Sequence, residues 1–159
     1  MTTVRVELGS RSYEIRVGAG QVALLGRAVA GVARDGRALV VTDRNVGGVW
    51  AKDAVGSLCS AGLDVRTHVV ASGERSKSLR TLERLYGTMV DARLTRDSVV
   101  VALGGGVVGD LGGFAAATFL RGLACVQVPT SLLAMVDSSV GGKTGVNLGA
   151  AKNLVGAFA

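Results

Sequence analysis

The stretch LGGGVVGDLGGFAAATFLRG, residues 103–122, decides the fold of this chain. It follows the apolar run SVVVAL at residues 98–103, which predicts a strand covered on both faces. Residues 107–120 are apolar on nearly every side and predict a buried helix. The glycines between them satisfy G-x-G-x-x-G over residues 104–109, a pattern that lets the amides of a helix N-terminus approach a diphosphate.

The glycine loop departs from the ordinary dinucleotide fingerprint in two ways. That fingerprint needs an acidic residue about 20 positions further on, and residues 121–129 contain no carboxylate. The loop also follows a late strand of the predicted sheet and not its first strand. A close-packed turn between strand and helix therefore stays open beside phosphate binding. Repeated glycine costs about 0.5–1 kcal/mol per interior position relative to alanine, which favours a backbone that closely approaches a ligand.

Strands and helices alternate along the rest of the chain. We expect an N-terminal hairpin of residues 4–8 and 13–17 around 9–12, strands at 37–42, 63–70, 98–103 and 124–128, and helices at 22–32, 46–61, 78–92, 107–120 and 131–136. Alternation implies right-handed crossovers. The predicted fold class is therefore α/β, with a Rossmann-like, mainly parallel sheet flanked by helices, and 159 residues fit one domain.

Polar segments follow successive strands of this sheet, at the carboxyl ends where open α/β sheets bind ligands. They are Asp43 and Asn45, residues 72–77, residues 104–110, and Thr130 with Ser131. Each has a purely structural alternative. Asp43 and Asn45 can cap one helix, and Thr130 and Ser131 can cap another. Glu74 and Lys77 can be a solvated pair, and the dipole of the following helix stabilises Asp110 without any ligand.

Composition narrows the function classes. The formal net charge is +6, but the arginines are scattered and aromatic residues make up only 4% of the chain. We therefore expect no nucleic-acid partner, and a general attraction for anionic metabolites. Cys59 and Cys125 lack metal-site spacing and are expected to be two buried free thiols. The N-terminus has no signal-peptide pattern and residues 114–120 are too short to span a bilayer, so no membrane partner and a cytoplasmic location are expected.

Two further features have alternative interpretations. Lys143 in GGKTG suggests a P-loop, but Asp137 stands where the first glycine of that motif belongs, so we do not expect an NTPase. His68 is the only histidine and lies within a predicted strand, where a packed or surface role is expected.

The chain resembles the 3-dehydroquinate synthases, within the wider sugar phosphate cyclases. The resemblance rests on residues 103–122, on PTSLLAMVDSSVGGKTGVN at 129–147, on SGERSK at 72–77 and on TDRNV at 42–46. It implies NAD as cofactor, bound by Asp43, Asn45, Ser72, Gly73, Glu74, Arg75, Ser76, Lys77, Gly105, Gly106, Val107, Val108, Gly109, Asp110, Thr130, Ser131, Lys143 and Lys152. It also implies that Asp137, Lys143, Arg121, Lys152 and Asn153 bind substrate and serve catalysis.

The resemblance implies a lyase of the shikimate pathway that converts 3-deoxy-D-arabino-heptulosonate 7-phosphate to 3-dehydroquinate and phosphate. Family enzymes are expected to form homodimers and to use zinc or cobalt, held by a Glu and two His in a later helical domain. We find no such ligands here, and expect residues 1–159 to be the NAD-binding N-terminal domain, truncated before the metal-binding domain and inactive alone. A non-catalytic NAD-binding module, a dimerisation fragment without a ligand and another sugar phosphate cyclase are the alternatives.

Overall fold

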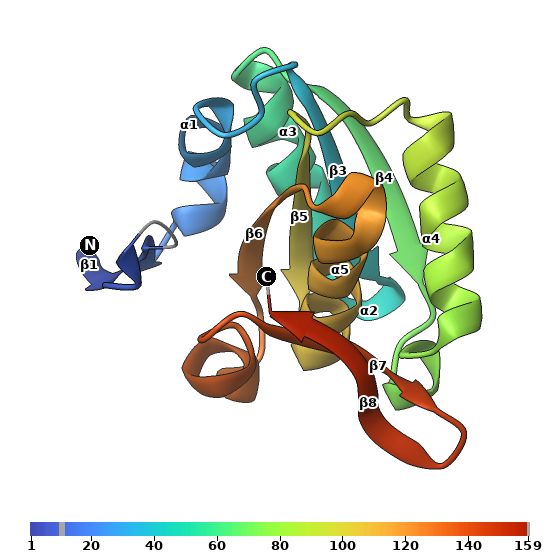
Figure 1. The fold of residues 1–159 in the computed structure, drawn as a ribbon. Coiled ribbons are helices and arrows are strands. Elements are labelled where there is room, and N and C mark those ends of the chain that lie inside the picture. The colour runs from blue at the N-terminus through green and yellow to red at the C-terminus, as the bar shows by residue number, and fades with distance from the viewer. Residues whose placement is uncertain (10–11, 159) are drawn as a thin grey trace.

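A four-stranded parallel sheet forms the centre of the molecule (Figure 1). The computed structural model describes residues 1–9 and 12–158. The strand order is β4-β3-β5-β6, and each neighbouring pair is parallel. The bounds are β3 (Arg37–Asp43), β4 (Asp64–Val70), β5 (Val99–Gly104) and β6 (Ala124–Pro129). These four strands and their parallel pairing confirm the predicted fold class, with bounds within one residue of expectation.

Helices cover both faces of the sheet, as the continuous apolar strands require. Leu39 and Val41 belong to the core cluster beneath α4 and α5, whereas Ala38 and Val40 belong to the cluster beneath α1 and α3. The bounds are α1 (Leu25–Ala30), α2 (Arg44–Val46), α3 (Lys52–Ser60), α4 (Leu79–Asp91) and α5 (Gly106–Thr118). Ser78 caps α4 by accepting a hydrogen bond from the Thr81 amide at 3.3 Å, as predicted.

Short irregular helices complete the chain. The predicted helix 22–32 is a 3₁₀ turn followed by α1, and the predicted helix 46–61 begins earlier, at α2, and passes through a π turn into α3. The region expected as helix 131–136 contains a π turn. The bounds are the 3₁₀ turns Gln21–Leu24, Glu74–Ser76 and Phe119–Arg121, and the π turns Gly47–Ala51 and Ala134–Ser138.

Two antiparallel hairpins lie outside the central sheet. The first, β1 (Thr2–Val6) with β2 (Tyr13–Val17), confirms the prediction, although its first strand begins two residues earlier than expected. Residues 10 and 11 of the predicted turn lie outside the described residues. The Tyr13 hydroxyl accepts a hydrogen bond from the Gly141 amide at 2.9 Å, which joins this hairpin to the loop before Lys143.

The second hairpin, β7 (Lys143–Leu148) with β8 (Ala151–Phe158), was not predicted. It packs against α5 and lies near the lower ends of the sheet strands in Figure 1. Its two strands approach so closely that a Cβ on Gly156 would stand 2.3 Å from the Thr144 carbonyl oxygen. Gly145 and Gly156 are therefore required by the close pairing of the two strands.

Three glycines of α5 are required by helix packing. A Cβ at Gly109 would stand 2.8 Å from the Gln127 side-chain oxygen, one at Gly112 3.2 Å from Ala102, and one at Gly113 2.5 Å from Thr144. Close packing therefore requires glycine at these three positions whether or not the backbone also meets a ligand, and the cofactor role of Gly109 stays a prediction. Their absent side chains let α5 lie against β5, β6 and β7.

Candidate functional site

The predicted ligand segments meet at the carboxyl edge of the sheet. From β3 the chain crosses to β4 on one side and then returns to β5 on the other, so the switch in direction lies between β3 and β5. Open α/β sheets bind ligands in the crevice that such a switch creates. Asp43 ends β3, residues 72–77 follow β4 and Gly104 ends β5.

The glycine loop leads into the N-terminus of α5. The first amides of this 13-residue helix have no intrahelical partner, and no side chain in the described part of the chain caps them. A Cβ on Gly106 would stand 3.0 Å from Ser138 Oγ, and one on Gly105 3.5 Å from Ser131 Oγ. Ser138 Oγ is buried and has no hydrogen-bond partner among the described residues. Free amides beside a narrow glycine cradle fit a diphosphate group.

The residues that follow Gly106 in α5 differ in which of their atoms a ligand could contact. Val108 is fully buried in the core and Gly109 is packed under Gln127, so only backbone atoms are available at those positions. Val107 is partly buried. Thr130 donates its amide to the Gly104 carbonyl at 3.0 Å, and Ser131 Oγ accepts from the Ala134 amide at 3.3 Å. The capping role of Ser131, left open by the sequence, is present in the structure.

Asp43 caps α2. Its Oδ1 accepts hydrogen bonds from the amides of Asn45 at 2.8 Å and Val46 at 3.0 Å, and Ser72 Oγ donates to the same oxygen at 3.3 Å. These bonds link the end of β3 to the segment after β4. In the described part of the chain, none of the hydrogen bonds found uses Asp43 Oδ2, which leaves that oxygen for a hydroxyl donor.

The segment 72–77 divides into an exposed and a buried part. Residues 72–75, including Gly73 and Arg75, are exposed, whereas Ser76 is buried and donates to the Ala71 carbonyl. Lys77 is only 4% exposed, and its ammonium donates to Asp110 at the start of α5. Lys77 therefore holds the glycine loop in place through Asp110, and its charge is already balanced by a partner.

Asp110 lies within a cluster of charges. Burial raises the pKa of the Asp110 carboxyl and the Glu74 carboxylate adds to that effect, while the ammonium groups of Lys77 and Lys143 oppose it. These four side chains come from three separate segments of the chain. The structure therefore brings Lys143, predicted for both cofactor and substrate, into the electrostatic neighbourhood of the glycine loop.

The β7–β8 hairpin carries the remaining predicted residues except Asp137 and Arg121. Lys143 Nζ lies 3.5 Å from Asp137 Oδ1 in an exposed pair. Lys152 and Asn153 are exposed in β8. Sequence reasoning missed Asn147, which donates from Nδ2 to Glu74 Oε1 at 2.8 Å and accepts at Oδ1 from the Asn153 amide at 2.9 Å. The one sequence signal for Asn147 is its position in GKTGVN, within the stretch that resembles the family.

Arg121 lies apart from the other predicted residues. It follows the C-terminus of α5, a helix of 13 residues, which places it about 20 Å along the helix axis from the glycine loop. Its backbone φ is 70°, in the left-handed region. The structure does not bring Arg121 to the carboxyl edge of the sheet, and its role in substrate binding stays a prediction.

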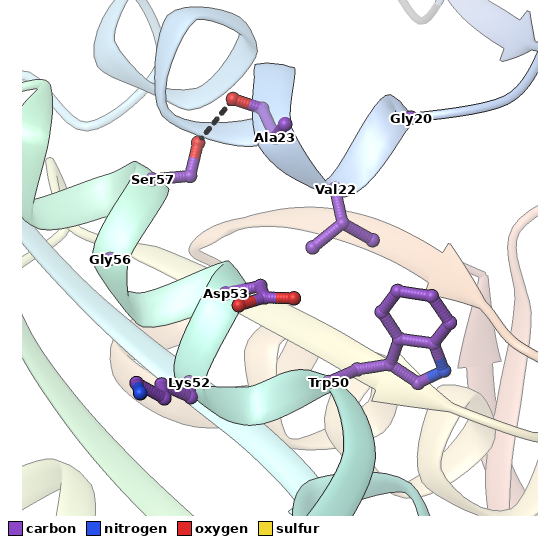
Figure 2. A pocket seen from close by; sticks show the side chains of 8 residues that line it. All are labelled: Gly20, Val22, Ala23, Trp50, Lys52, Asp53, Gly56 and Ser57. Atoms are coloured by element: carbon purple, nitrogen blue, oxygen red, sulfur yellow. Dashed lines mark hydrogen bonds between the residues drawn. The ribbon is translucent and has the colours of Figure 1, made fainter.

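A separate concavity lies on the α1/α3 face of the sheet. Figure 2 shows it between the Gln21–Leu24 turn and α3, with Trp50 and Asp53 among its lining residues. It contains none of the predicted site residues. Cys59 and Cys125 are free thiols, but Cys59 is exposed and Cys125 only partly buried, so the expectation that both are buried is wrong for Cys59. Among residues 1–9 and 12–158, no group of three or more His, Cys, Asp or Glu side chains could hold a metal ion. The described residues therefore do not fit the zinc or cobalt centre that the resemblance implies.

The fold and this edge define the class of protein: an open α/β domain with a glycine loop at its topological switch point. Residues 67–159 match the sequence model of the family described as 3-dehydroquinate synthase N-terminal. The chain belongs to that family. No helix in the described part of the chain combines the length and hydrophobicity needed to span a bilayer.

The chain is also similar to individual dehydroquinate synthases and to solved structures of two other cyclases. The 3-dehydroquinate synthase of Symbiobacterium thermophilum is 55% identical over 96% of this chain, which spans 43% of that protein. A 2-deoxy-scyllo-inosose synthase solved with carbaglucose-6-phosphate, NAD⁺ and Co²⁺ superposes with a TM-score of 0.88 at 29% identity, over 99% of this chain and 43% of its own. A 2-epi-5-epi-valiolone synthase from Streptomyces hygroscopicus, solved with NAD⁺ and Zn²⁺, gives a TM-score of 0.72 at 31% identity, over 77% of this chain and 34% of its own.

Proposed function

We propose that this chain is the NAD-binding part of a 3-dehydroquinate synthase. The observation that carries the proposal is the uncapped N-terminus of α5 at the switch point, flanked by the carboxylates of Asp43 and Glu74. Helix N-terminal amides suit a diphosphate, and a carboxylate oxygen suits the hydroxyls of a ribose. The presence of NAD⁺ in both solved cyclases named above supports the same cofactor here.

Different residues at this edge would contact different parts of the cofactor. Gly105, Gly106 and Val107 would present amides to the diphosphate, and Glu74 would accept from a ribose. Asp43, Asn45 and Ser72 would face the adenosine end, while Asp110, Thr130 and Ser131 would lie at the nicotinamide end. When bound, NAD⁺ would accept a hydride from the substrate and return it within the same turnover. The protein's own contribution is orientation and charge placement.

The substrate of the whole enzyme would be a sugar phosphate, 3-deoxy-D-arabino-heptulosonate 7-phosphate. Lys143 and Lys152 offer ammonium groups on the β7–β8 hairpin, and Asn153 offers an amide beside them. Asp137 lies 3.5 Å from Lys143 and would orient it. Because the described residues do not fit a metal centre, we derive no step through a metal ion for this chain.

The other sugar phosphate cyclases are the second candidate. The solved cyclases that make 2-deoxy-scyllo-inosose and 2-epi-5-epi-valiolone share 29% and 31% identity with this chain, against 55% for the Symbiobacterium dehydroquinate synthase. The higher identity favours dehydroquinate synthase. A non-catalytic NAD-binding module would also bind the cofactor, so cofactor binding alone does not separate it from the first proposal.

Calorimetric titration of the chain with NAD⁺ tests the cofactor site. We expect saturable binding by the wild type and a loss of at least about tenfold in affinity for Gly106→Val, whose branched side chain would fill the cradle beside Ser138. Gly87→Ala is the matched control, because an added Cβ there meets no atom within 4 Å. Absence of binding by the wild type, or equal affinity in Gly106→Val, would contradict the proposal.

A further inference from the structure

We propose that Asn147 is a positioning residue that fixes the cofactor loop and the substrate-side hairpin relative to one another. The inference rests on the proposed function, because it assigns Glu74 to the cofactor and residues 152 and 153 to the substrate. Asn147 itself need touch neither ligand. Through Asn147, structural ordering of the cofactor loop would promote ordering of the substrate-side hairpin, and the reverse.

Both ends of the Asn147 side chain are used. Nδ2 donates to Glu74 Oε1 at 2.8 Å, and Oδ1 accepts from the Asn153 amide at 2.9 Å. An amide group supplies one donor end and one acceptor end, so it can serve a carboxylate and a backbone N–H together. Glu74 is exposed and is held on one oxygen only, which leaves Oε2 for a ligand.

The backbone of Asn147 is anchored to the same loop. Its amide donates to the Lys77 carbonyl at 2.9 Å, and Ser78 and Asn147 form an isolated parallel bridge. Lys77 in turn is paired with Asp110 at the start of α5. The side chain of Asn147 therefore reaches Glu74 from a fixed backbone position, and the contact does not depend on a free loop folding back.

On the hairpin side, Asn147 supports an irregular backbone. The pairing of β7 with β8 passes from Val146↔Val155 to Leu148↔Ala151, so residues 152–154 lie opposite Asn147 alone. Asn153 has a φ of 54°, in the left-handed region that few residues other than glycine adopt. Its amide has no regular ladder partner in this bulge, and Asn147 Oδ1 supplies one. Lys152 is presented from the same bulge.

Substitutions separate the two halves of this contact. Asn147→Asp keeps an oxygen for the Asn153 amide but replaces the donor to Glu74 with a like charge. Asn147→Leu removes both hydrogen bonds. Ala150→Asp adds the same negative charge at the exposed turn between β7 and β8 and is the matched control.

The decisive measurement is a double-mutant cycle on NAD⁺ affinity in the 159-residue chain. We expect Asn147→Asp to weaken binding about tenfold and Ala150→Asp less than about twofold, since a charge-assisted hydrogen bond is lost only in the former. In a Glu74→Ala background, Asn147→Asp should cost less than about twofold more. An equal cost in both backgrounds would overturn the inference.

Hydrogen exchange supplies a second readout that a merely structural role would not move. We expect NAD⁺ to slow amide exchange at residues 72–77 and at 151–155 in the wild type, and to slow it only at 72–77 in Asn147→Asp. If the wild type binds no NAD⁺, the proposed function fails. Hydrogen exchange measured without NAD⁺ then still tests the role of Asn147. Asn147→Leu must then exchange faster than the wild type in both segments, and unchanged exchange at Asn153 would overturn it.

Discussion

Lys77 and Asp110 show what a single pair of residues does for this site. Lys77 has a side chain only 5% exposed, and a buried ammonium without a counter-charge would cost several kcal/mol. Asp110 supplies that charge from the first turns of α5. The pair therefore joins the segment after β4 to the helix that the glycine loop begins.

We predict that Asp110→Asn destabilises the protein by about 3–5 kcal/mol, because it leaves the Lys77 ammonium buried without its partner. Urea unfolding at neutral pH measures the change. Asp137→Asn is the matched control, since the Asp137–Lys143 pair is exposed and its loss should change stability by less than about 1 kcal/mol. Equal effects of the two substitutions would contradict the prediction.

His68 gives the protein a pH dependence near neutrality. Its Nδ1 lies 2.7 Å from Thr88 Oγ1 between β4 and α4, and burial lowers the pKa of the imidazole below its ordinary 6.5. The unfolded chain therefore takes up a proton at a higher pH than the folded chain does. It follows that the stability contributed by neutral His68 is present above pH 6.5 and falls as the pH drops below it.

We predict that the wild type loses unfolding free energy between pH 7.5 and 5.5, two values about one unit either side of the unfolded His pKa. His68→Gln cannot titrate there and should lose less. Urea unfolding curves of both proteins at the two pH values test this. Identical losses would show that another group causes the dependence.

Among the elements, the pair α1 and α3 depends on one glycine. A Cβ on Gly26 would stand 2.0 Å from the Ser57 carbonyl oxygen, and the Gly26 amide donates to Ser57 Oγ at 3.0 Å. We predict that Gly26→Ala destabilises the protein by about 3 kcal/mol, because the two helices must move apart. Gly56→Ala, in α3 and lining the concavity of Figure 2, meets no atom within 4 Å and should stabilise by about 0.5–1 kcal/mol. Thermal melts of both variants decide the matter.

The sequence predicted those elements whose patterns have a single physical meaning. Runs such as Val99–Gly104 are apolar throughout because both faces of the strand are covered, so the central sheet was predictable. The β7–β8 hairpin was not, because its glycines suit a ligand loop as well as two closely paired strands. The π turns at Gly47–Ala51 and Ala134–Ser138 have no simple sequence pattern either.

The candidate site was predictable in its position and less so in its contacts. Strand ends locate Asp43, residues 72–77 and the glycine loop at one edge, because parallel strands share a direction. The burial of Lys77 and the contact of Asn147 with Glu74 depend on side chains from segments far apart in the chain. Local patterns carry no information about such contacts. Arg121 was grouped with the site by resemblance alone.

At the scale of the whole molecule, the described residues supply the proposed cofactor edge but no group of side chains that could hold a metal ion. We predict that this chain, mixed with NAD⁺, Co²⁺ and the heptulosonate phosphate, releases no phosphate above the rate in buffer. A phosphate-release assay measures this, with a 3-dehydroquinate synthase of full family length as the positive control. Clear turnover by the 159-residue chain would refute the prediction.

The single hydrogen bond between Tyr13 and Gly141 has a practical consequence for anyone preparing this protein. Gly141 and Gly142 both have left-handed φ angles and directly precede Lys143, so the bond to Tyr13 holds the backbone two residues before Lys143. Tyr13 lies in β2, which pairs with β1, so an affinity tag fused ahead of Met1 is joined directly to the hairpin that makes this hydrogen bond. Purification handles are therefore better removed by protease before any ligand titration is begun.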